Sequence, residues 1–148
     1  MYQTLLFALL HVGGACEQQA PSVVRAAISA GERYNVPPKV LLAVVMAETR
    51  CRNVVSKRRH DGGRDVGYAQ IHLKPEQLHL IPRYLHPRHN LRRAALILSR
   101  SRALCKRTQH PKCRRSIWIR YNWHSRTWAK KVRRYLREIE RHMRKAAW

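Results

Sequence analysis

The sequence predicts a single domain that is mainly α-helical, with one polar loop and little or no β-sheet. The chain has 148 residues, a length that suits one hydrophobic core. Several segments repeat apolar residues at intervals of three and four positions, which is the spacing of an amphipathic helix. Residues 50–65 are polar and contain glycine without such a period, which indicates an ordered surface loop between helices.

Residues 1–20 have the character of a hydrophobic leader. The apolar block 5–12 is followed by two glycines, Ala15 and Cys16, similar to the cleavage region of a signal peptide. We therefore expect residues 1–20 to be a leader and residues 21–148 to form a mature domain, exported to the periplasm or outside the cell. The Lys or Arg usual at the start of a leader is missing, and a buried N-terminal helix would give the same pattern. No stretch is long enough to span a bilayer.

The first two helices of the expected mature domain follow from their caps and apolar periods. Ser22 should cap a helix that fades between Gly31 and Tyr34. Pro38 suits the first turn of the next helix, because the amide hydrogen that proline lacks would have no helical partner there. That second helix continues to Glu48.

Further helices are expected over four later segments, residues 75–81, 91–98, 117–123 and 128–143. Pro82 and Pro87 should bracket an irregular stretch, and Asn90 should cap the helix that follows it. The last segment is basic and amphipathic, with its apolar side formed by Trp128, Val132, Tyr135, Leu136 and Ile139.

The net charge is +23 with all nine histidines counted as neutral. A surface with this charge attracts polyanions, whether nucleic acid, an anionic membrane or the anionic polymers of a bacterial envelope. Charge alone does not choose among these partners.

The four cysteines are consistent with an oxidising compartment. Cys105 and Cys113 flank a basic segment and could form a disulfide that staples two helices together. Cys16 and Cys51 could form a second bridge, or Cys16 could be lost with the leader. A zinc site formed by Cys105, His110, Cys113 and His124 is less favoured, because the spacing matches no common zinc-finger pattern. No metal is expected.

Glu48 ends a helical segment, residues 41–48, that is otherwise apolar. Leu41, Val44 and Val45 precede it by seven, four and three positions, so the four side chains share one face of the helix. A carboxyl group on a core face is poorly solvated, which raises its pKa. An acid that keeps its proton near neutral pH can protonate a leaving oxygen, as a glycosidase requires.

Four short motifs follow one another along the chain. They are Ala47-Glu48-Thr49, Gly67-Tyr68-Ala69-Gln70-Ile71, a helix opening with Asn90, and Arg120-Tyr121-Asn122. In this order they resemble the motifs of lysozyme-like lytic transglycosylases, the soluble transglycosylase (SLT) family. That family carries Glu-Ser at the end of a buried helix, then Gly-Leu-Met-Gln-Ile, a helix opening with Asn, and Ala-Tyr-Asn. The resemblance covers residues 22–137 and implies the lysozyme-like fold of goose-type lysozymes and SLT domains.

The resemblance implies a role for each matching residue. Glu48 is similar to the family's single catalytic acid and base. The implied substrate-binding residues are Thr49, Gly67, Tyr68, Gln70, Tyr121 and Asn122. Asp65 is an auxiliary candidate because it lies close to Gly67 in the sequence. The chain departs from the family at Tyr68-Ala69, and at Arg50-Cys51-Arg52, where a Gly is usual.

The implied activity is cleavage of the β-1,4 bond between N-acetylmuramic acid and N-acetylglucosamine in peptidoglycan, which leaves 1,6-anhydro ends and needs no cofactor. A muramidase-type hydrolase on the same fold, with Asp61 or Asp65 positioning water, is one alternative. A cationic nucleic-acid-binding protein is another, although no recognised nucleic-acid motif is present. Membrane disruption by the basic C-terminal helix is a third. The expected partners are therefore peptidoglycan strands and anionic envelope surfaces, with nucleic acid less favoured.

Overall fold

The computed structural model describes residues 1–12, 16, 18–108 and 126–146. Of the described residues, 72% are helical and 6% lie in strands. The prediction of a mainly α-helical protein with little β-sheet is therefore confirmed.

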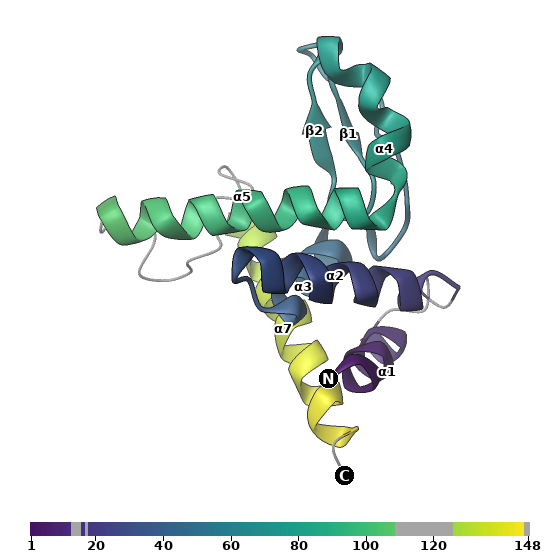
Figure 1. Cartoon of the computed structure of the whole chain (residues 1–148), viewed down its shortest axis with the longest axis vertical. Coiled ribbons are helices and arrows are strands. Elements are labelled where there is room, and N and C mark those ends of the chain that lie inside the picture. Colours follow the sequence, from purple (N-terminus) through teal and green to yellow (C-terminus); the bar gives the residue numbers. More distant parts are fainter. Residues whose placement is uncertain (13–15, 17, 109–125, 147–148) are drawn as a thin grey trace.

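Helices α2 (Ala20–Tyr34) and α5 (Pro87–Thr108) lie side by side across the middle of the molecule (Figure 1). Helix α3 (Pro38–Thr49) packs against α2. On the same side of α5, α1 (Tyr2–Val12) packs against α2 and α7 (Arg126–Lys145), and α7 also covers α3. The helices thus enclose a core that is built from residues far apart in the sequence.

A small hairpin projects from the opposite side of α5 (Figure 1). Strands β1 (Arg64–Val66) and β2 (Ile71–Leu73) pair antiparallel, with Val66 opposite Ile71 across a turn at residues 67–70. A 3-10 helix, η1 (Pro75–Leu80), follows as predicted. The chain then returns to α5.

The return segment corrects one sequence expectation. Residues between Pro82 and Pro87 were expected to be irregular, but α4 (Ile81–Leu85) occupies this stretch. Pro82 stands in the first turn of α4, where its missing N–H costs no helical hydrogen bond. Proline therefore opens a helix here instead of breaking one.

Helix α3 is the most deeply buried element among the described residues, with every side chain from Val40 to Met46 buried. Pro38 opens the helix, as predicted. The helix ends at Thr49, and Arg50 takes the left-handed conformation (φ 51°) while its N–H bonds the carbonyl of Met46. Glu48 is therefore in the last turn of an otherwise enclosed helix.

Helix α1 packs into the core through Leu5, Ala8 and Leu9, which are buried against its neighbours. Beyond α1, Cys16 forms a disulfide with Cys51, so the bridge that was one of two alternatives for Cys16 is present. It ties the segment before α2 to Cys51, two residues after the end of α3. The leader expected over residues 1–20, and export with it, stays a prediction.

The start of α2 differs from the prediction, whereas α7 agrees with it. Helix α2 begins at Ala20, so Ser22 is not its cap; the Ser22 hydroxyl donates instead to the carbonyl of Gln19 at 2.8 Å. Helix α7 confirms the expected basic helix and buries the predicted residues Trp128, Val132, Tyr135 and Ile139.

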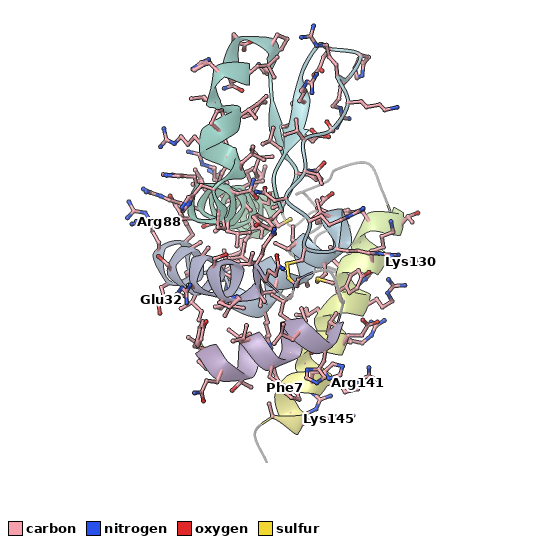
Figure 2. The ribbon with its side chains drawn as sticks, turned by 90° about the vertical axis from the view of Figure 1, so that its right-hand side faces the viewer. Phe7, Glu32, Arg88, Lys130, Arg141 and Lys145 are labelled. Carbon is pink, nitrogen blue, oxygen red and sulfur yellow. A yellow bond between two sulfur atoms is a disulfide. The ribbon has the colours of Figure 1, made fainter. Side chains whose placement is uncertain are left out.

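The outer face of α7 is cationic, with Lys130, Arg141 and Lys145 pointing away from the core (Figure 2). The helix expected over residues 117–123 and the expected partner of Cys105, Cys113, lie outside the described residues. No helix within the described ranges is both long and apolar enough to cross a membrane.

Candidate active site

Glu48 is partly buried, and its Oε1 accepts a 2.7 Å hydrogen bond from the indole Nε1–H of Trp128 on α7. Burial raises the pKa of Glu48 to about 7, because the charged form loses much of its water. The bond from Trp128 opposes this rise by stabilising the carboxylate. At neutral pH, acid and carboxylate therefore coexist, which suits a group that both gives and takes a proton.

Two charges on other elements also act on Glu48. Asp65 of β1 raises the pKa of Glu48 by repulsion, and Lys131 of α7 lowers it by attraction. Lys131 lies three positions after Trp128, close to one helical turn further along α7. The end of α3, the start of α7 and the hairpin thus meet at one carboxyl group.

The hydroxyl of Thr49 joins α3 to the hairpin turn. Its Oγ1 lies 2.9 Å from the carbonyl of Tyr68 and 3.2 Å from that of Val45, and the Thr49 side chain is buried. Tyr68 is buried as well, and its hydroxyl donates to Oε1 of Gln19 at 2.8 Å; burial raises the pKa of Tyr68. Both residues therefore position the turn beside Glu48, and their expected contact with substrate stays a prediction.

Asn90 organises the same turn from the other side. Helix α5 begins at Pro87, so Asn90 lies inside the helix and the expectation that it caps the helix is wrong. Its Oδ1 accepts from the N–H of Ala69 at 2.8 Å, and its Nδ2 donates to the carbonyls of Val66 (2.8 Å) and Tyr84 (2.9 Å). A fully buried side chain thus supplies three bonds that hold the hairpin turn against α5.

Gly67 allows this close approach of Asn90. It has a φ of 76°, and a Cβ there would lie 2.5 Å from the carbonyl oxygen of Tyr84 and would overlap the amide of Asn90. The family resemblance implies that Gly67 is a substrate-binding residue, and this stays a prediction. In the structure the group that approaches its backbone is an asparagine side chain.

Gln70 closes the turn. Its backbone is left-handed (φ 48°), and its Nε2 donates to the carbonyls of Gly67 at 2.8 Å and Val54 at 3.2 Å. The side-chain amide therefore links the turn to the polar loop. Contact of Gln70 with a sugar stays a prediction.

Asp65 lies in a chain of polar side chains at the hairpin that are joined by hydrogen bonds. Its Oδ2 lies 2.6 Å from Nη1 of Arg59, and its Oδ1 lies 2.9 Å from Nδ1 of His72. Nε2 of His72 is in turn 2.9 Å from Oδ2 of Asp61. The N–H of Gly63, and then His72, lower the pKa of Asp61. Both carboxylates are thus already paired by neighbouring groups.

Two of the expected site residues, Tyr121 and Asn122, lie outside the described residues. Glu48, Thr49, Gly67, Tyr68 and Gln70 are brought together at the junction of α3 and the hairpin turn, through the contacts given above. Trp128, which bonds Glu48 directly, was not among the site residues predicted from the sequence. An indole on an otherwise apolar helix face was a usable signal, because a buried Nε1–H needs an acceptor.

Comparisons of the chain with protein-family models, with curated proteins and with solved structures found no match. The geometry of the site and the motifs of the sequence are therefore what bear on function.

Proposed function

We propose that this protein is a peptidoglycan lytic transglycosylase with a lysozyme-like fold, in which Glu48 is the single catalytic acid and base. The observation that carries the proposal is the state of Glu48. It is a partly buried carboxyl group at the end of a buried helix, bonded to Trp128, with its pKa raised to about 7. Such a group can both donate and accept a proton at neutral pH.

The proposed reaction needs one protein carboxyl group. Protonated Glu48 gives its proton to the glycosidic oxygen as the bond from C1 of N-acetylmuramic acid to that oxygen breaks. The C6 hydroxyl of the same sugar then bonds to C1, and its proton passes to the Glu48 carboxylate. The product carries a 1,6-anhydro ring, and the enzyme returns to its protonated state. Attack within one sugar also gains from proximity.

The pairing of the other acids supports this route over hydrolysis. An ordinary glycosidase uses a second carboxylate, either as a nucleophile or to activate water. Here Asp65 is bonded to Arg59 and His72, and Asp61 is bonded to His72 and the N–H of Gly63. The hydrogen bonds to Asp61 lower its pKa and make it a weaker base, while both oxygens of Asp65 are engaged by Arg59 and His72. The charge of Asp65 then adds to the rise in the pKa of Glu48 that burial causes.

Gln70, Tyr121 and Asn122 are proposed to line the sugar groove, with Thr49, Gly67 and Tyr68 holding the turn that shapes it. Peptidoglycan strands are the proposed substrate, and export to the periplasm or outside the cell is the proposed location. The Cys16–Cys51 disulfide supports an oxidising compartment.

The packing of α7 argues against the alternative in which this helix disrupts membranes. The apolar side chains Trp128, Val132 and Ile139 are buried against other helices. In the folded protein the apolar side of α7 is therefore buried, and the cationic face is the side exposed to solvent.

Digestion of purified peptidoglycan by the wild-type protein and Glu48→Gln tests the proposal. We expect the wild type to release muropeptides whose ends are lighter, by the mass of one water, than reducing ends, and we expect Glu48→Gln to release none. Glu32→Gln, an exposed glutamate on α2, is the matched control and should digest like the wild type. Substantial cleavage by Glu48→Gln would overturn the assignment of Glu48, and reducing ends would show a hydrolase.

A further inference from the structure

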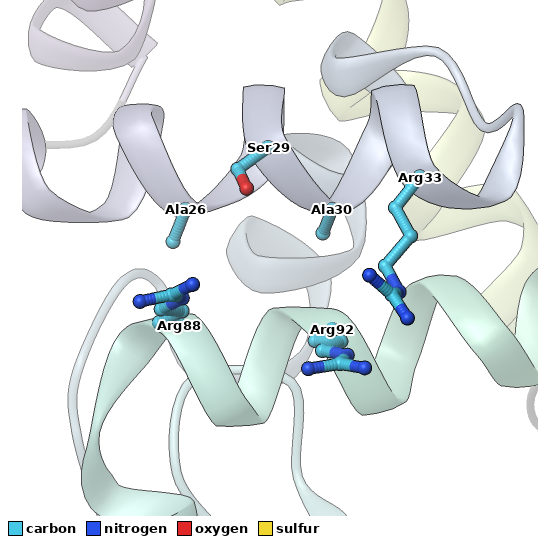
Figure 3. Close-up of a pocket in the computed structure, with 6 residues that line it drawn as sticks. All are labelled: Ala26, Ser29, Ala30, Arg33, Arg88 and Arg92. Carbon is cyan, nitrogen blue, oxygen red and sulfur yellow. The ribbon is translucent and has the colours of Figure 1, made fainter.

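A groove lined by arginine runs between α2 and α5. Ala26 and Ala30 of α2 line it on one side, and Arg88 and Arg92 of α5 line it on the other (Figure 3). Arg33 reaches into the same space from the end of α2, beyond Ser29. The cavity that these six residues line has a volume of about 110 Å³. None of them takes part in the contacts made by Glu48.

The guanidinium groups of the groove have no carboxylate partner within the described part of the chain. The described ion pairs involve other residues, and Glu32, the acid next to Arg33, forms none of them. Arg92 instead lies 3.4 Å from the hydroxyl of Tyr34, and Arg33 lies over the Tyr34 ring. Hydrogen bonds donated by Arg92 and Arg33 lower the pKa of Tyr34. Positive charge is thus concentrated without a counter-ion of the protein's own, which favours binding of an anion.

The groove continues at both ends. A cavity of about 290 Å³ shares Ala26, Ser29 and Arg88 with the central one and adds Ser22, Arg25, His86 and Pro87. A cavity of about 220 Å³ shares Arg92 and adds Tyr34, Arg83, Tyr84, His89, Arg93 and Leu96. Three adjoining cavities with arginine in each suit an elongated ligand that carries repeated negative charges better than a single small ion.

We propose that the α2/α5 groove binds a linear polymer linked by phosphodiester bonds, of the kind found among anionic envelope polymers. Guanidinium groups bind phosphate with two parallel hydrogen bonds, and the successive arginines offer a partner to successive phosphates. This binding holds the protein on the envelope and is independent of the chemistry proposed for Glu48.

Nucleic acid fits the groove less well. A single strand binds by stacking its bases on aromatic rings along its path, and alanine lines one side of the central cavity. Tyr34 and Tyr84 line only one end. Duplex DNA is read by elements that protrude into its major groove, whereas these arginines line a recess between two helices.

Binding of labelled poly(glycerol phosphate) to the full-length protein tests this proposal. Replacing Arg33, Arg88 and Arg92 together by Gln should weaken binding at least tenfold. It should also reduce the slope of log affinity against log salt concentration by about 2, because three phosphate contacts are lost. The matched control replaces Lys130, Arg137 and Arg141 of α7 by Gln, which removes the same charge from another face. Lys130 and Arg141 lie away from Arg88 (Figure 2), and the control should lose less than threefold.

A second variant avoids removing the arginines. Ser29 is exposed on α2, so Ser29→Glu leaves the core intact and places a carboxylate among the guanidinium groups. We expect it to unfold no more readily than the wild type, to bind the polymer at least tenfold more weakly, and to digest purified peptidoglycan normally. An equal loss of binding in the groove and α7 triple variants would overturn the proposal. So would equal affinity for polyglutamate, or tighter binding of duplex DNA through the same arginines.

Discussion

The indole Nε1–H of Trp128 lies 2.7 Å from Oε1 of Glu48, although the two residues are 80 positions apart in the chain. This bond joins the first turns of α7 to the last turn of α3. Protonation of the proposed catalytic acid and the packing of the basic C-terminal helix are therefore linked through one contact.

Trp128→Phe should shift the pH dependence of wall cleavage upward. Phenylalanine keeps an aromatic ring but removes the donor that stabilises the Glu48 carboxylate, so the pKa of Glu48 should rise above its wild-type value of about 7. Since the first step needs the protonated acid, the limb of activity lost as pH rises should move to higher pH. The pH profile of kcat/KM measures this, and an unchanged or lower limb would contradict it.

Glu48→Gln should make the folded protein more stable at pH 8 but not at pH 4. Below about pH 4.5 the folded and unfolded chains both hold the proton. Between 4.5 and about 7 only the folded chain keeps it, so wild-type stability falls as pH rises through this window. At pH 8 the wild type should have lost about 3 kcal/mol of its free energy of unfolding. Glutamine avoids this loss because its side chain does not ionise. Denaturant unfolding at both pH values measures the difference.

Glu32→Gln is the control for the exchange of a carboxylate for an amide, because Glu32 is exposed on α2. If Glu48→Gln changes the free energy of unfolding by the same amount at pH 4 and pH 8, folding does not raise the pKa of Glu48.

Much of the fold could be predicted from the sequence, because apolar periodicity reports directly on which helix faces are buried. The ranges of α3 and α7 follow from Pro38, from the apolar run before Glu48 and from the spacing of Trp128, Val132 and Ile139. Glu48 could be singled out because a lone carboxyl group at the end of such a run must be poorly solvated.

The contacts around the hairpin could not be predicted in the same way. Asn90 looks like a helix cap because Asn is favoured at that position in general. Its three bonds depend instead on where the hairpin turn lies in space. The bond from Trp128 to Glu48 likewise depends on how α7 crosses α3, which no local pattern contains.

Asn90→Ala should destabilise the protein by about 3 kcal/mol. The substitution leaves the N–H of Ala69 and the carbonyls of Val66 and Tyr84 without the side chain that satisfies them in a buried place. Asn53→Ala is the matched control, because Asn53 is exposed and makes a single bond to the carbonyl of Leu85. It should cost less than about 1 kcal/mol. Equal costs for the two variants, measured by urea unfolding, would contradict the role given to Asn90.

Replacing Cys16 and Cys51 together by Ser should lower stability by roughly 4 kcal/mol. The disulfide closes a loop across a sequence separation of 35 residues, and the open chain has more conformational freedom when unfolded. Adding a reductant should lower the stability of the wild type as well, because it opens the Cys16–Cys51 bond. The double variant lacks this bond, so the reductant should not lower its stability in this way. A double variant as stable as the oxidised wild type would show that the bridge adds nothing to folding.

Arg50→Gly should stabilise the protein by about 0.5–1 kcal/mol, because Arg50 ends α3 in the left-handed conformation that glycine adopts without strain. Asn35 gives a matched control. It ends α2 with almost the same backbone angles, but asparagine tolerates this conformation, so Asn35→Gly should gain less. Thermal unfolding of both variants measures the difference. A larger gain at Asn35 than at Arg50 would mean that the left-handed turn after Glu48 is not a source of strain.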